Sequence, residues 1–479
     1  MPSRPPADWA RITRSATATG AEVATMERFG RWFESRRRTD SLRVDRVPLD
    51  ELTGWHRRAG TADVVHDSGK FFSVRGLRVR TSLGPVHDWT QPIFDQPEIG
   101  VLGIVVKEFN GVLHCLMQAK AEPGDPGGVQ LSPTVQATKS NYTQVHGGRP
   151  VPYLDHFRQP AHHRVLADVL QSEQGSWFYR KRNRNIAIEV TEDVEVLDGF
   201  HWLTIGQLHR LLAVDNIVNM DARTVLSCLP FSGPGLADGT GEDDELSSAV
   251  ARSSSTDQPS RHSMGELLSW ITDSRVRNEV DTTLIPLSEV AGWRLSAGRL
   301  SHHTGAYFDV LGVSVRAARR EVGSWSQPMI EPTGQGVVAF MVKSIGGVLH
   351  ALVNARVEPG YLDVVELAPT VQCNPENYGT VLAGHRPPFL DEVLASTAEQ
   401  RVFDTVLSEE GGRFYHATNR YLIVWTEPDR GLACPPDFRW ITLAQLGALL
   451  QHSHYVNVQA RTLVACLHSL RRPRARRVA

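Results

Sequence analysis

Two segments of this 479-residue chain place an imidazole, an amide and a cation on one side of a predicted strand. Between residues 112 and 120 the odd-numbered positions are apolar, as expected for a strand that buries one face. The even-numbered positions are His114, Leu116, Gln118 and Lys120, and further along the chain a similar face carries His350, Leu352, Asn354 and Arg356. Such a face is typical of a pocket wall that binds or deprotonates a polar ligand. The alternative is a solvated face with a structural histidine.

The next polar groups suit hydrogen bonding to a nucleobase edge or to sugar hydroxyls. They are Thr134, Gln136, Asn141 and Tyr142, and the matching residues further along the chain are Thr370, Gln372, Asn377 and Tyr378. Trp89 and Trp325 could stack on a base. The alternative is that the aromatic side chains are core and the amides hold turns. The candidates for binding a diphosphate are Arg80, Lys120, Arg184, Arg316, Arg356 and Arg420, because a guanidinium fork fits phosphate oxygens.

These groups occur twice because the chain is a tandem repeat. Residues 103–142 match residues 339–378 without a gap, and L-S-P-T-V-Q at 131–136 recurs as L-A-P-T-V-Q at 367–372. We predict a disordered N-terminus over 1–20, a first repeat over 21–230 and a second over 263–470. Residues 231–262, rich in Gly, Ser, Asp and Glu, are predicted to be a flexible linker, and 471–479 a basic tail.

Each repeat mixes strands and helices. Asn110-Gly111 predicts a tight hairpin turn between strands 101–107 and 112–120, because both residue types tolerate the positive φ that such a turn requires. Gly346-Gly347 satisfies the same requirement in the second repeat. A helix is predicted over 163–174, ending at Gly175, followed by a strand over 185–190. Two short helices close the repeat, the first capped by Thr204 and its copy by Thr442. The predicted fold class is α/β with α+β character, a mixed sheet covered by helices in each repeat.

Composition and missing motifs exclude several classes of protein. The formal net charge of -2 argues against a nucleic-acid partner. The five cysteines include no C-x-x-C, so neither a disulfide framework nor a zinc site is predicted. The sequence predicts no signal peptide and has no apolar run long enough for a bilayer, so we expect a cytoplasmic protein without a membrane partner. P-loop, dinucleotide-binding, zincin and hydrolase-elbow motifs are absent, so nothing calls for a nicotinamide, flavin or metal cofactor.

The motifs resemble those of the NDP-hexose 2,3-dehydratases, which are carbon–oxygen lyases of deoxysugar biosynthesis. The resemblance rests on L-[SA]-P-T-V-Q followed by N-Y, and on S-E-Q-G-x-x-F-Y at 172–179 followed by Asn183-Arg184. It covers both repeats and implies two Nudix-like domains, a homodimer, and binding of a dTDP-linked sugar. The chain has no glutamate-rich Nudix box, so metal-dependent diphosphate hydrolysis is not expected. Fold kinship alone assigns no function.

The family's substrate, dTDP-4-keto-6-deoxy-D-glucose, explains the absence of a cofactor. Its C4 ketone acidifies the C3 proton, so a base and donors to the enolate oxygen suffice, and an acid helps the C2 hydroxyl to leave. The resemblance implies a 3,4-diketo-2,6-dideoxy product, which an NADPH-dependent 3-ketoreductase then consumes. Two alternatives remain open: a non-catalytic nucleotide-sugar-binding or scaffold protein, and a divergent nucleotide hydrolase. The hydrolase is less favoured because the sequence shows no carboxylate cluster for its metal.

Chemistry confined to one repeat should use residues that differ between the copies. The first copy has Lys139, His146 and Arg149 where the second has Pro375, Leu382 and His385, and Glu376 replaces Ser140. One hypothesis pairs Tyr142 or His114 with Lys139 or His146 as acid and base. The rival hypothesis pairs Tyr378 or His350 with Glu376.

Overall fold

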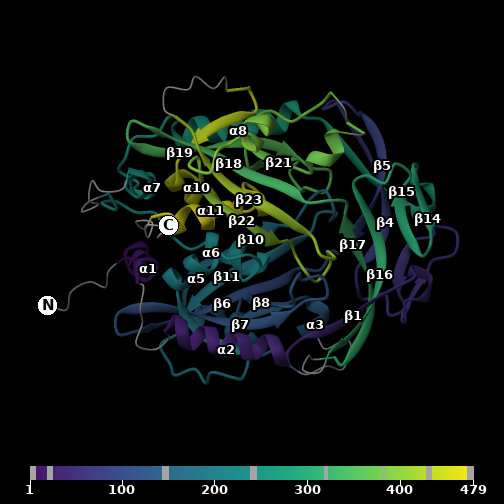
Figure 1. Ribbon diagram of the computed structural model, residues 1–479, viewed down its shortest axis with the longest axis horizontal. Helices are drawn as coiled ribbons and strands as arrows, with labels where there is room; N and C mark the ends of the chain where they lie inside the picture. Colours follow the sequence, from purple (N-terminus) through teal and green to yellow (C-terminus); the bar gives the residue numbers. More distant parts are fainter. Residues whose placement is uncertain are drawn as a thin grey trace.

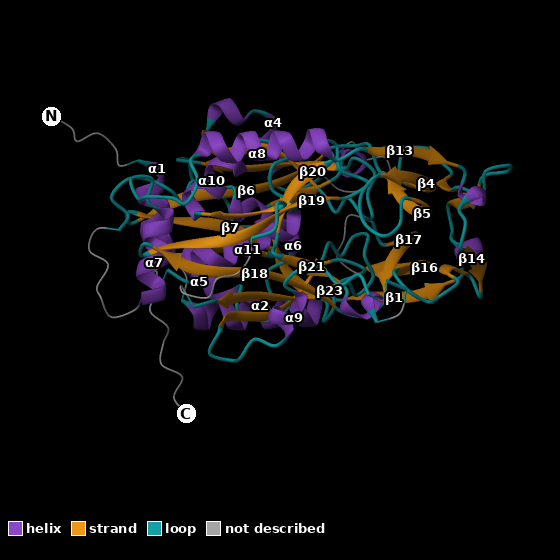
Figure 2. Cartoon of the chain, turned by 90° about the horizontal axis from the view of Figure 1, so that it is seen from above, coloured by secondary structure: helices purple, strands orange, loops and turns teal. Residues whose placement is uncertain are grey.

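Each half of the chain forms one large mixed sheet and one small antiparallel sheet (Figure 1). The computed structural model describes residues 7–18, 25–142, 150–237, 245–317, 322–379, 381–382, 384–427 and 434–471. In both views the small sheets lie together at one end of the molecule, while the large sheets and most helices form the other (Figures 1 and 2). The predicted mixed α/β class and its duplication are therefore confirmed.

The elements of the first half are α1 (Asp8–Thr17), α2 (Met26–Thr39), β1 (Leu42–Val47), β2 (Trp55–Arg57), β3 (Val64–His66), β4 (Ser73–Thr81), β5 (Asp88–Asp95), β6 (Gly100–Phe109), β7 (Val112–Ala121), β8 (Val129–Ser132), β9 (Val135–Ala137), α3 (Lys139–Tyr142), α4 (Leu154–Arg158), β10 (Arg164–Ser172), β11 (Arg182–Glu189), β12 (Phe200–Thr204), α5 (Ile205–Leu211) and α6 (Met220–Ser227). Those of the second half are α7 (Glu245–Ser254), α8 (Met264–Arg277), β13 (Val280–Ile285), β14 (Trp293–Ser296), β15 (Arg299–His302), β16 (Phe308–Ala317), β17 (Ser324–Pro332), β18 (Gly336–Ile345), β19 (Val348–Val357), β20 (Val365–Ala368), β21 (Val371–Cys373), α9 (Leu390–Leu394), β22 (Arg401–Ser408), β23 (Thr418–Trp425), β24 (Phe438–Ile441), α10 (Leu443–Leu450) and α11 (Val458–Ser469).

The large sheets have the same strand order in both halves. The first runs β10-β11-β6-β7-β12, with β8 paired to β7 and β9 to β6; the second runs β22-β23-β18-β19-β24, with β20 and β21 in the equivalent places. The contact between β11 and β6 is parallel and its neighbours are antiparallel. The predicted hairpin is confirmed, since Asn110 and Gly111 both have positive φ, at 50° and 77°. Thr204 and Thr442 also cap α5 and α10 as predicted.

The predicted helix over 163–174 is wrong, because this segment forms β10. A β-bulge lies between Val165 and Ala167, and it shifts the alternation of buried side chains by one residue. The apolar positions then fall at a spacing that imitates a helix. The second half has the same irregularity between Arg401 and Phe403. Gly175 ends no helix; its carbonyl accepts a hydrogen bond from the Gly360 amide at 2.7 Å.

The small sheets exchange strands between the two halves. Strand β1 of the first half pairs with β16 over residues 42–47, and β13 of the second half pairs with β4 over residues 280–285. All pairings in these two sheets are antiparallel. Each half therefore completes a sheet of the other, and the halves are one interlocked unit rather than two separate domains.

Helices α6 and α11 pack against each other between the two halves, where two buried arginines make reciprocal contacts. Arg223 donates to Thr462 Oγ1 at 3.3 Å and to the Ser408 carbonyl at 2.5 Å. Arg461 donates to Thr224 Oγ1 at 2.5 Å and to the Ser172 carbonyl at 2.6 Å. Both guanidinium groups are fully buried, so each is solvated by carbonyls and hydroxyls of the other half.

The predicted disorder of residues 1–20 is wrong for the part that the structure describes, because residues 8–17 form α1. Ile12 is buried in the core, and Ser15 Oγ donates to the Leu113 carbonyl at 2.6 Å and accepts from the Ile205 amide at 3.0 Å. The predicted linker is likewise too long, since α7 makes the same contacts in the second half. There Ser253 Oγ donates to the Leu349 carbonyl at 2.6 Å and accepts from the Leu443 amide at 2.8 Å.

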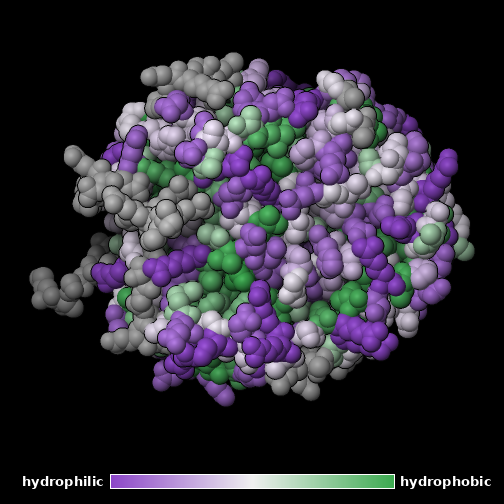
Figure 3. Space-filling model, in the orientation of Figure 1, coloured by the Kyte–Doolittle hydropathy of each residue, from purple (hydrophilic) through white to green (hydrophobic). Residues whose placement is uncertain are grey.

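The visible surface is mostly hydrophilic, with hydrophobic side chains in small separate patches (Figure 3). The odd-numbered side chains of β7 are buried in the core of the first half, as predicted, and so are Cys228 and, in the second half's core, Cys466. No helix of the described residues has the length and apolar character needed to span a membrane.

Candidate active site

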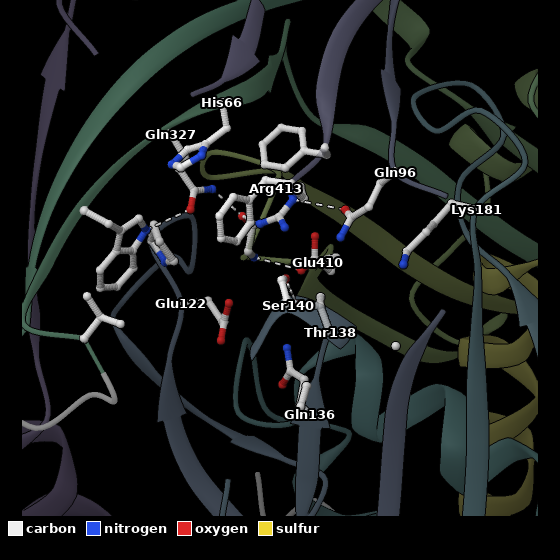
Figure 4. A pocket seen from close by; sticks show the side chains of 18 of the residues that line it. His66, Gln96, Glu122, Gln136, Thr138, Ser140, Lys181, Gln327, Glu410 and Arg413 are labelled. Atoms are coloured by element: carbon white, nitrogen blue, oxygen red, sulfur yellow. Dashed lines mark hydrogen bonds between the residues drawn. The ribbon is translucent and has the colours of Figure 1, made fainter. Parts of the chain in front are cut away.

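A cavity of about 460 Å³ lies at the junction of the two halves. One wall is the end of the first large sheet, where β7, β9 and β11 flank β6. The opposite wall comes from β2, β3 and the second half's β17, and the loop between β22 and β23 closes one side. Figure 4 shows that residues of both halves point into this space. The volume is in the range typical of small-ligand sites.

Carboxyl groups from four separate stretches of the described chain line the cavity: Glu122, Glu173, Asp221 and Glu410. Burial raises the pKa of Glu410 to about 7, although the nearby Arg413 guanidinium opposes the shift. Burial also raises the pKa of Glu173, and it raises that of Asp221 well above its usual range. Within the described residues, Glu410 Oε2 and Asp221 Oδ1 have no hydrogen-bond partner. The cavity therefore holds carboxyl groups that can exchange protons near neutral pH.

Glu410 reaches this cavity because a loop of the second half is fastened to a loop of the first. The Gly124 amide donates to the Gly411 carbonyl at 2.7 Å, and the His416 amide donates to the Gly124 carbonyl at 2.9 Å. A Cβ on Gly124 would lie 1.8 Å from the Phe414 carbonyl oxygen, so only glycine permits this approach. The Gly412 amide donates to Glu410 Oε1 at 3.1 Å and orients the carboxyl group.

Cationic side chains face the carboxyl groups. Lys120 forms an ion pair with Glu122 at 2.9 Å and donates to the Gln136 carbonyl at 3.1 Å. Lys181 donates to the Glu98 carbonyl, and burial lowers its pKa to about 8. In the view of Figure 4, Glu410 lies between Glu122 and Lys181. Lys181 therefore supplies a cation whose charge depends on pH in the neutral to mildly basic range.

Arg413 lies between the carboxyl groups and an aromatic region of the cavity. Its Nε donates to Gln96 Oε1 at 3.2 Å, and its guanidinium lies 4.2 Å from the centre of the Phe72 ring. The other aromatic side chains of the lining are Trp55, His66, Phe71, Phe178 and Trp325. This region offers flat apolar faces, whereas the opposite region offers ionisable groups.

Hydroxyl and amide groups form the remaining wall. Thr138 and Ser140 hydroxyls are 2.8 Å apart, and the Ser140 amide donates to Glu98 Oε2 at 2.8 Å. Gln136 Oε1 accepts from Asn219 Nδ2 at 3.0 Å. These side chains are held by their neighbours and could bind sugar hydroxyls with little loss of freedom.

The structure brings Lys120, Gln136 and Trp325 of the predicted site residues into the cavity. Trp325 Nε1 donates to Gln327 Oε1 at 2.8 Å, and Gln327 in turn donates to the Gly412 carbonyl at 2.6 Å. Trp89, its copy, makes the same contact with Gln91 at 2.9 Å but does not line the cavity.

The predicted histidines and threonines have structural contacts instead. His114 and His350 are 1% exposed, and each Nδ1 contacts a backbone carbonyl of its own strand at 2.9 Å. Thr134 Oγ1 donates to the Leu116 carbonyl and accepts from the Val105 amide; Thr370 does the same in the second half. The threonine hydroxyls connect neighbouring strands by hydrogen bonds, and all four side chains lie outside the cavity lining.

The predicted phosphate-binding arginines also lie elsewhere. Arg184 and Arg420 form forked pairs with Asp168 and Asp404, at closest distances of 2.6 Å. Arg80 lies 3.4 Å from Asp88, and Arg316 is exposed on β16. None of these four side chains lines the described cavity.

Arg356 and Gln372 occupy the place in the second half that Lys120 and Gln136 have in the first. Arg356 Nε pairs with Glu358 at 2.8 Å, and Gln372 Nε2 donates to the same carboxylate at 3.0 Å. The buried Tyr361 stands where the first half has Asp125. Gln118 and Asn354, also predicted as ligands, lie on β7 and β19 outside the cavity lining.

The predicted acid–base sets around the two N-Y motifs are only partly described. Lys139 and Glu376 are exposed, and Tyr378 packs partly buried against the second half's core. Asn377 Oδ1 accepts from the Tyr307 amide at 3.4 Å, and neither residue lines the cavity. The side chains of Asn141 and Tyr142, and residue His146, lie outside the described residues.

Sequence reasoning missed the buried charged groups, although the repeat held a signal for them. Glu410 stands where the first copy has Gln174, Arg413 where it has Trp177, and Lys181 where the second copy has Ala417. These differences between the copies lie outside the N-Y segment, where the two acid–base hypotheses were placed. The four cavity carboxyl groups come from distant stretches of the chain, so no local motif announces them.

Comparison with known proteins agrees over nearly the whole chain. A family model described as NDP-hexose 2,3-dehydratase matches residues 26–229 and again 264–467. A Saccharopolyspora spinosa protein named dTDP-4-dehydro-6-deoxy-alpha-D-glucopyranose 2,3-dehydratase is 51% identical over 463 residues, covering 96% of this chain and 94% of that protein. Proteins of the same name from Amycolatopsis orientalis and Streptomyces violaceoruber are 46% and 49% identical, covering 96% and 92% of this chain and 93% and 97% of their own lengths. The resemblance of the motifs is thereby confirmed, and the chain belongs to the NDP-hexose 2,3-dehydratase family.

Proposed function

We propose that this chain removes water across C2 and C3 of dTDP-4-keto-6-deoxy-D-glucose, and that the reaction takes place in the cavity between the halves. The observation that carries the proposal is Glu410, a cavity carboxyl group whose pKa is raised to about 7 by burial. A base of this pKa is well matched to removing a proton next to a ketone at neutral pH. Full-length similarity to proteins named for this reaction supports the choice of substrate.

In the proposed reaction Glu410 starts as a carboxylate and takes the proton from C3. Charge then develops on the C4 oxygen, which the Lys181 ammonium stabilises. Asp221 starts protonated, because burial raises its pKa well above the usual range, and it gives this proton to the departing C2 hydroxyl. The C2–O bond breaks, water leaves, and a C2=C3 enol next to the C4 ketone remains.

The enol then becomes the 3,4-diketone, and the enzyme returns to its starting state. Protonated Glu410 gives its proton to C2, and the Asp221 carboxylate takes the proton of the C3 hydroxyl. Each of the two carboxyl groups ends in the protonation state in which it began. The loss of water and the tautomerisation are redox-neutral, so this cycle consumes no added electron carrier. Glu173, which accepts from Asn183 Nδ2 at 2.7 Å, lies beside this pair as a further buried carboxyl group that disfavours a second negative charge.

The nucleotide is proposed to occupy the aromatic region of the cavity. Trp325 and Phe72 offer faces for the thymine ring, and Arg413 offers a guanidinium between this region and the carboxyl groups, where a diphosphate would lie. Lys120 and Gln136 are proposed to hold the sugar. Of the sequence predictions, Asn141, Tyr142 and His146 stay candidates, because they follow Ser140 directly or closely in the chain.

Two partner proposals follow from the family resemblance and the product's chemistry. We propose that the protein is a homodimer. We also propose that an NADPH-dependent 3-ketoreductase consumes the product, since a vicinal diketone is reactive and is best reduced soon after release.

The test is incubation of the purified chain with dTDP-4-keto-6-deoxyglucose, with and without a 3-ketoreductase and NADPH, followed by mass spectrometry of the nucleotide. Loss of one water, with NADPH oxidation only when the ketoreductase is present, supports the dehydratase. Bound but unchanged sugar would make the chain a binding protein. Release of dTMP would make it a hydrolase. An Asp221→Asn variant should bind the sugar nucleotide and leave it intact.

A further inference from the structure

Two histidines and a glutamate meet at a place separate from the cavity. His156 lies on α4, His163 precedes β10, and Glu192 follows β11. One nitrogen of each imidazole and one carboxylate oxygen all lie within 4.8 Å of one another. His156 Nδ1 is 3.3 Å from His163 Nε2, and Glu192 Oε1 is 3.8 Å from His156 Nδ1 and 3.7 Å from His163 Nδ1. None of the three lines the cavity.

The surroundings hold these three groups in position. Lys107 Nζ donates to the carbonyls of Thr191 and Glu192, at 2.9 and 2.7 Å, and so fixes the backbone that carries the carboxylate. Tyr153, three residues before His156, donates its hydroxyl to the Glu195 carbonyl at 2.6 Å. Tyr153 therefore joins the segment that carries His156 to the loop that carries Glu192, and Lys107 of β6 holds the same loop from another side.

The two imidazoles face each other with ring nitrogens at hydrogen-bond distance. A ring nitrogen of each histidine faces the space shared with the carboxylate, and a neutral imidazole presents a lone pair there. His163 has only 11% of its side chain exposed, whereas about half of the Glu192 side chain faces solvent; its Oε2 accepts from the Thr191 amide at 3.2 Å, and its Oε1 faces the imidazoles.

We propose that His156, His163 and Glu192 bind a divalent transition-metal ion of the Zn²⁺ class. Two imidazole nitrogens and one carboxylate are a known donor set for such ions, with a further position open to water. Ligand atoms about 2.0–2.2 Å from a tetrahedral ion lie about 3.3 Å apart. His156 Nδ1 and His163 Nε2 already have that spacing. Glu192 Oε1 is 3.8 Å from His156 Nδ1 but approaches the other ring nitrogen of His163, so in this proposal the carboxylate moves toward Nε2 when the ion binds.

The ion has a structural role in this proposal, because it joins the chain before β10 to the chain after β11. The site belongs to the first half alone: the second half has Glu392, Glu399 and Pro428 at the equivalent positions. The predicted dehydration in the cavity does not use the ion. Metal binding and catalysis can therefore be separated by experiment.

The test uses the full chain, freed of metal with a chelator and then titrated with Co²⁺ and with Zn²⁺. Binding is measured by calorimetry and by the visible absorption of low-symmetry cobalt. Wild-type protein should bind one equivalent that is lost or weakened more than about 100-fold in His156→Ala and in Glu192→Gln. His162→Ala, an exposed histidine beside the cluster, should bind as wild type does.

The Glu192→Gln variant controls for misfolding as the cause of lost binding. Its carboxylate is half exposed, and its replacement leaves both imidazoles in place. Dehydratase turnover without metal should be equal in wild type and Glu192→Gln. The proposal is overturned if wild-type protein takes up no ion, or if the Glu192→Gln and His156→Ala variants bind cobalt as tightly and with the same spectrum as wild type. In the latter case other exposed histidines hold the ion.

Discussion

Replacing Glu410 with glutamine tests the proposed base most directly. The change keeps size and hydrogen bonding, and glutamine is the residue that the first copy carries at this place, Gln174. A positioned general base contributes about 10²- to 10⁴-fold to rate, so kcat should fall by that factor. With a pKa of about 7 for Glu410 and about 8 for Lys181, wild-type kcat should rise about fivefold between pH 6 and pH 8, and this rise should be absent from the variant.

The same substitution has an opposite effect on stability. Burial raises the pKa of Glu410 from 4.5 to about 7, so the folded state binds the proton more tightly than the unfolded state does. Below pH 4.5 the carboxyl group is protonated in both states and costs no stability. The free energy of unfolding then falls as pH rises through 7, because the buried carboxyl group has to ionise. Glutamine removes that penalty, which is at most about 3 kcal/mol at pH 8. Glu410→Gln should be nearly inactive yet melt higher than wild type at pH 8, with little difference at pH 4.5.

The assay couples turnover to NADPH oxidation through excess 3-ketoreductase, with thermal melts recorded in the same buffers. Glu399→Gln, an exposed carboxylate outside the cavity lining, is the matched control and should change neither quantity. A Glu410→Gln enzyme that keeps its activity and its rise between pH 6 and pH 8 would refute the assignment of the base.

Three further predictions concern other parts of the molecule. Lys181→Met should lower kcat by about 10²-fold while the dTDP dissociation constant changes little. In wild type, activity should decline above pH 8 as Lys181 loses its proton. If the variant shows the same decline above pH 8 as wild type, Lys181 does not have this role. Tyr378→Phe should keep full activity in the coupled assay, because this tyrosine packs on the second half's core; an inactive variant would restore the rival catalytic set. Arg461→Met should lower the free energy of unfolding by about 3 kcal/mol, measured by urea titration, because buried carbonyls lose their donors.

Much of the fold followed from patterns confined to short stretches. The duplication, the hairpin at Asn110-Gly111 and the caps at Thr204 and Thr442 depend on residues close in the chain, where turn and cap chemistry is decisive. The helix predicted over 163–174 was wrong because the bulge in β10 alters the period of buried side chains. Only the pairing of β10 with β11 shows where the extra residue lies. Helix α1 was missed because its match to α7 is short, with Arg14-Ser15 recurring as Arg252-Ser253.

The site was harder to predict than the fold because its two ends come from different halves. Lys120, Gln136 and Trp325 were found because their types and alternation mark a polar wall or a stacking face. Glu410 was not found, since its approach depends on the contact between Gly124 and Gly411, which no periodicity reveals. The pKa shifts arise from burial, a property of the assembled cavity rather than of any segment.

The exchange of β1 and β13 has a consequence for how the protein is made. When the ribosome has completed the first half, β4 still lacks the neighbour that β13 will supply about 200 residues later in the chain. An unpaired strand edge in a nascent chain is a site for association with other chains, and contacts so distant in sequence form slowly. Production in a foreign host should therefore depend on holding chaperones and low temperature more strongly than the final stability would suggest.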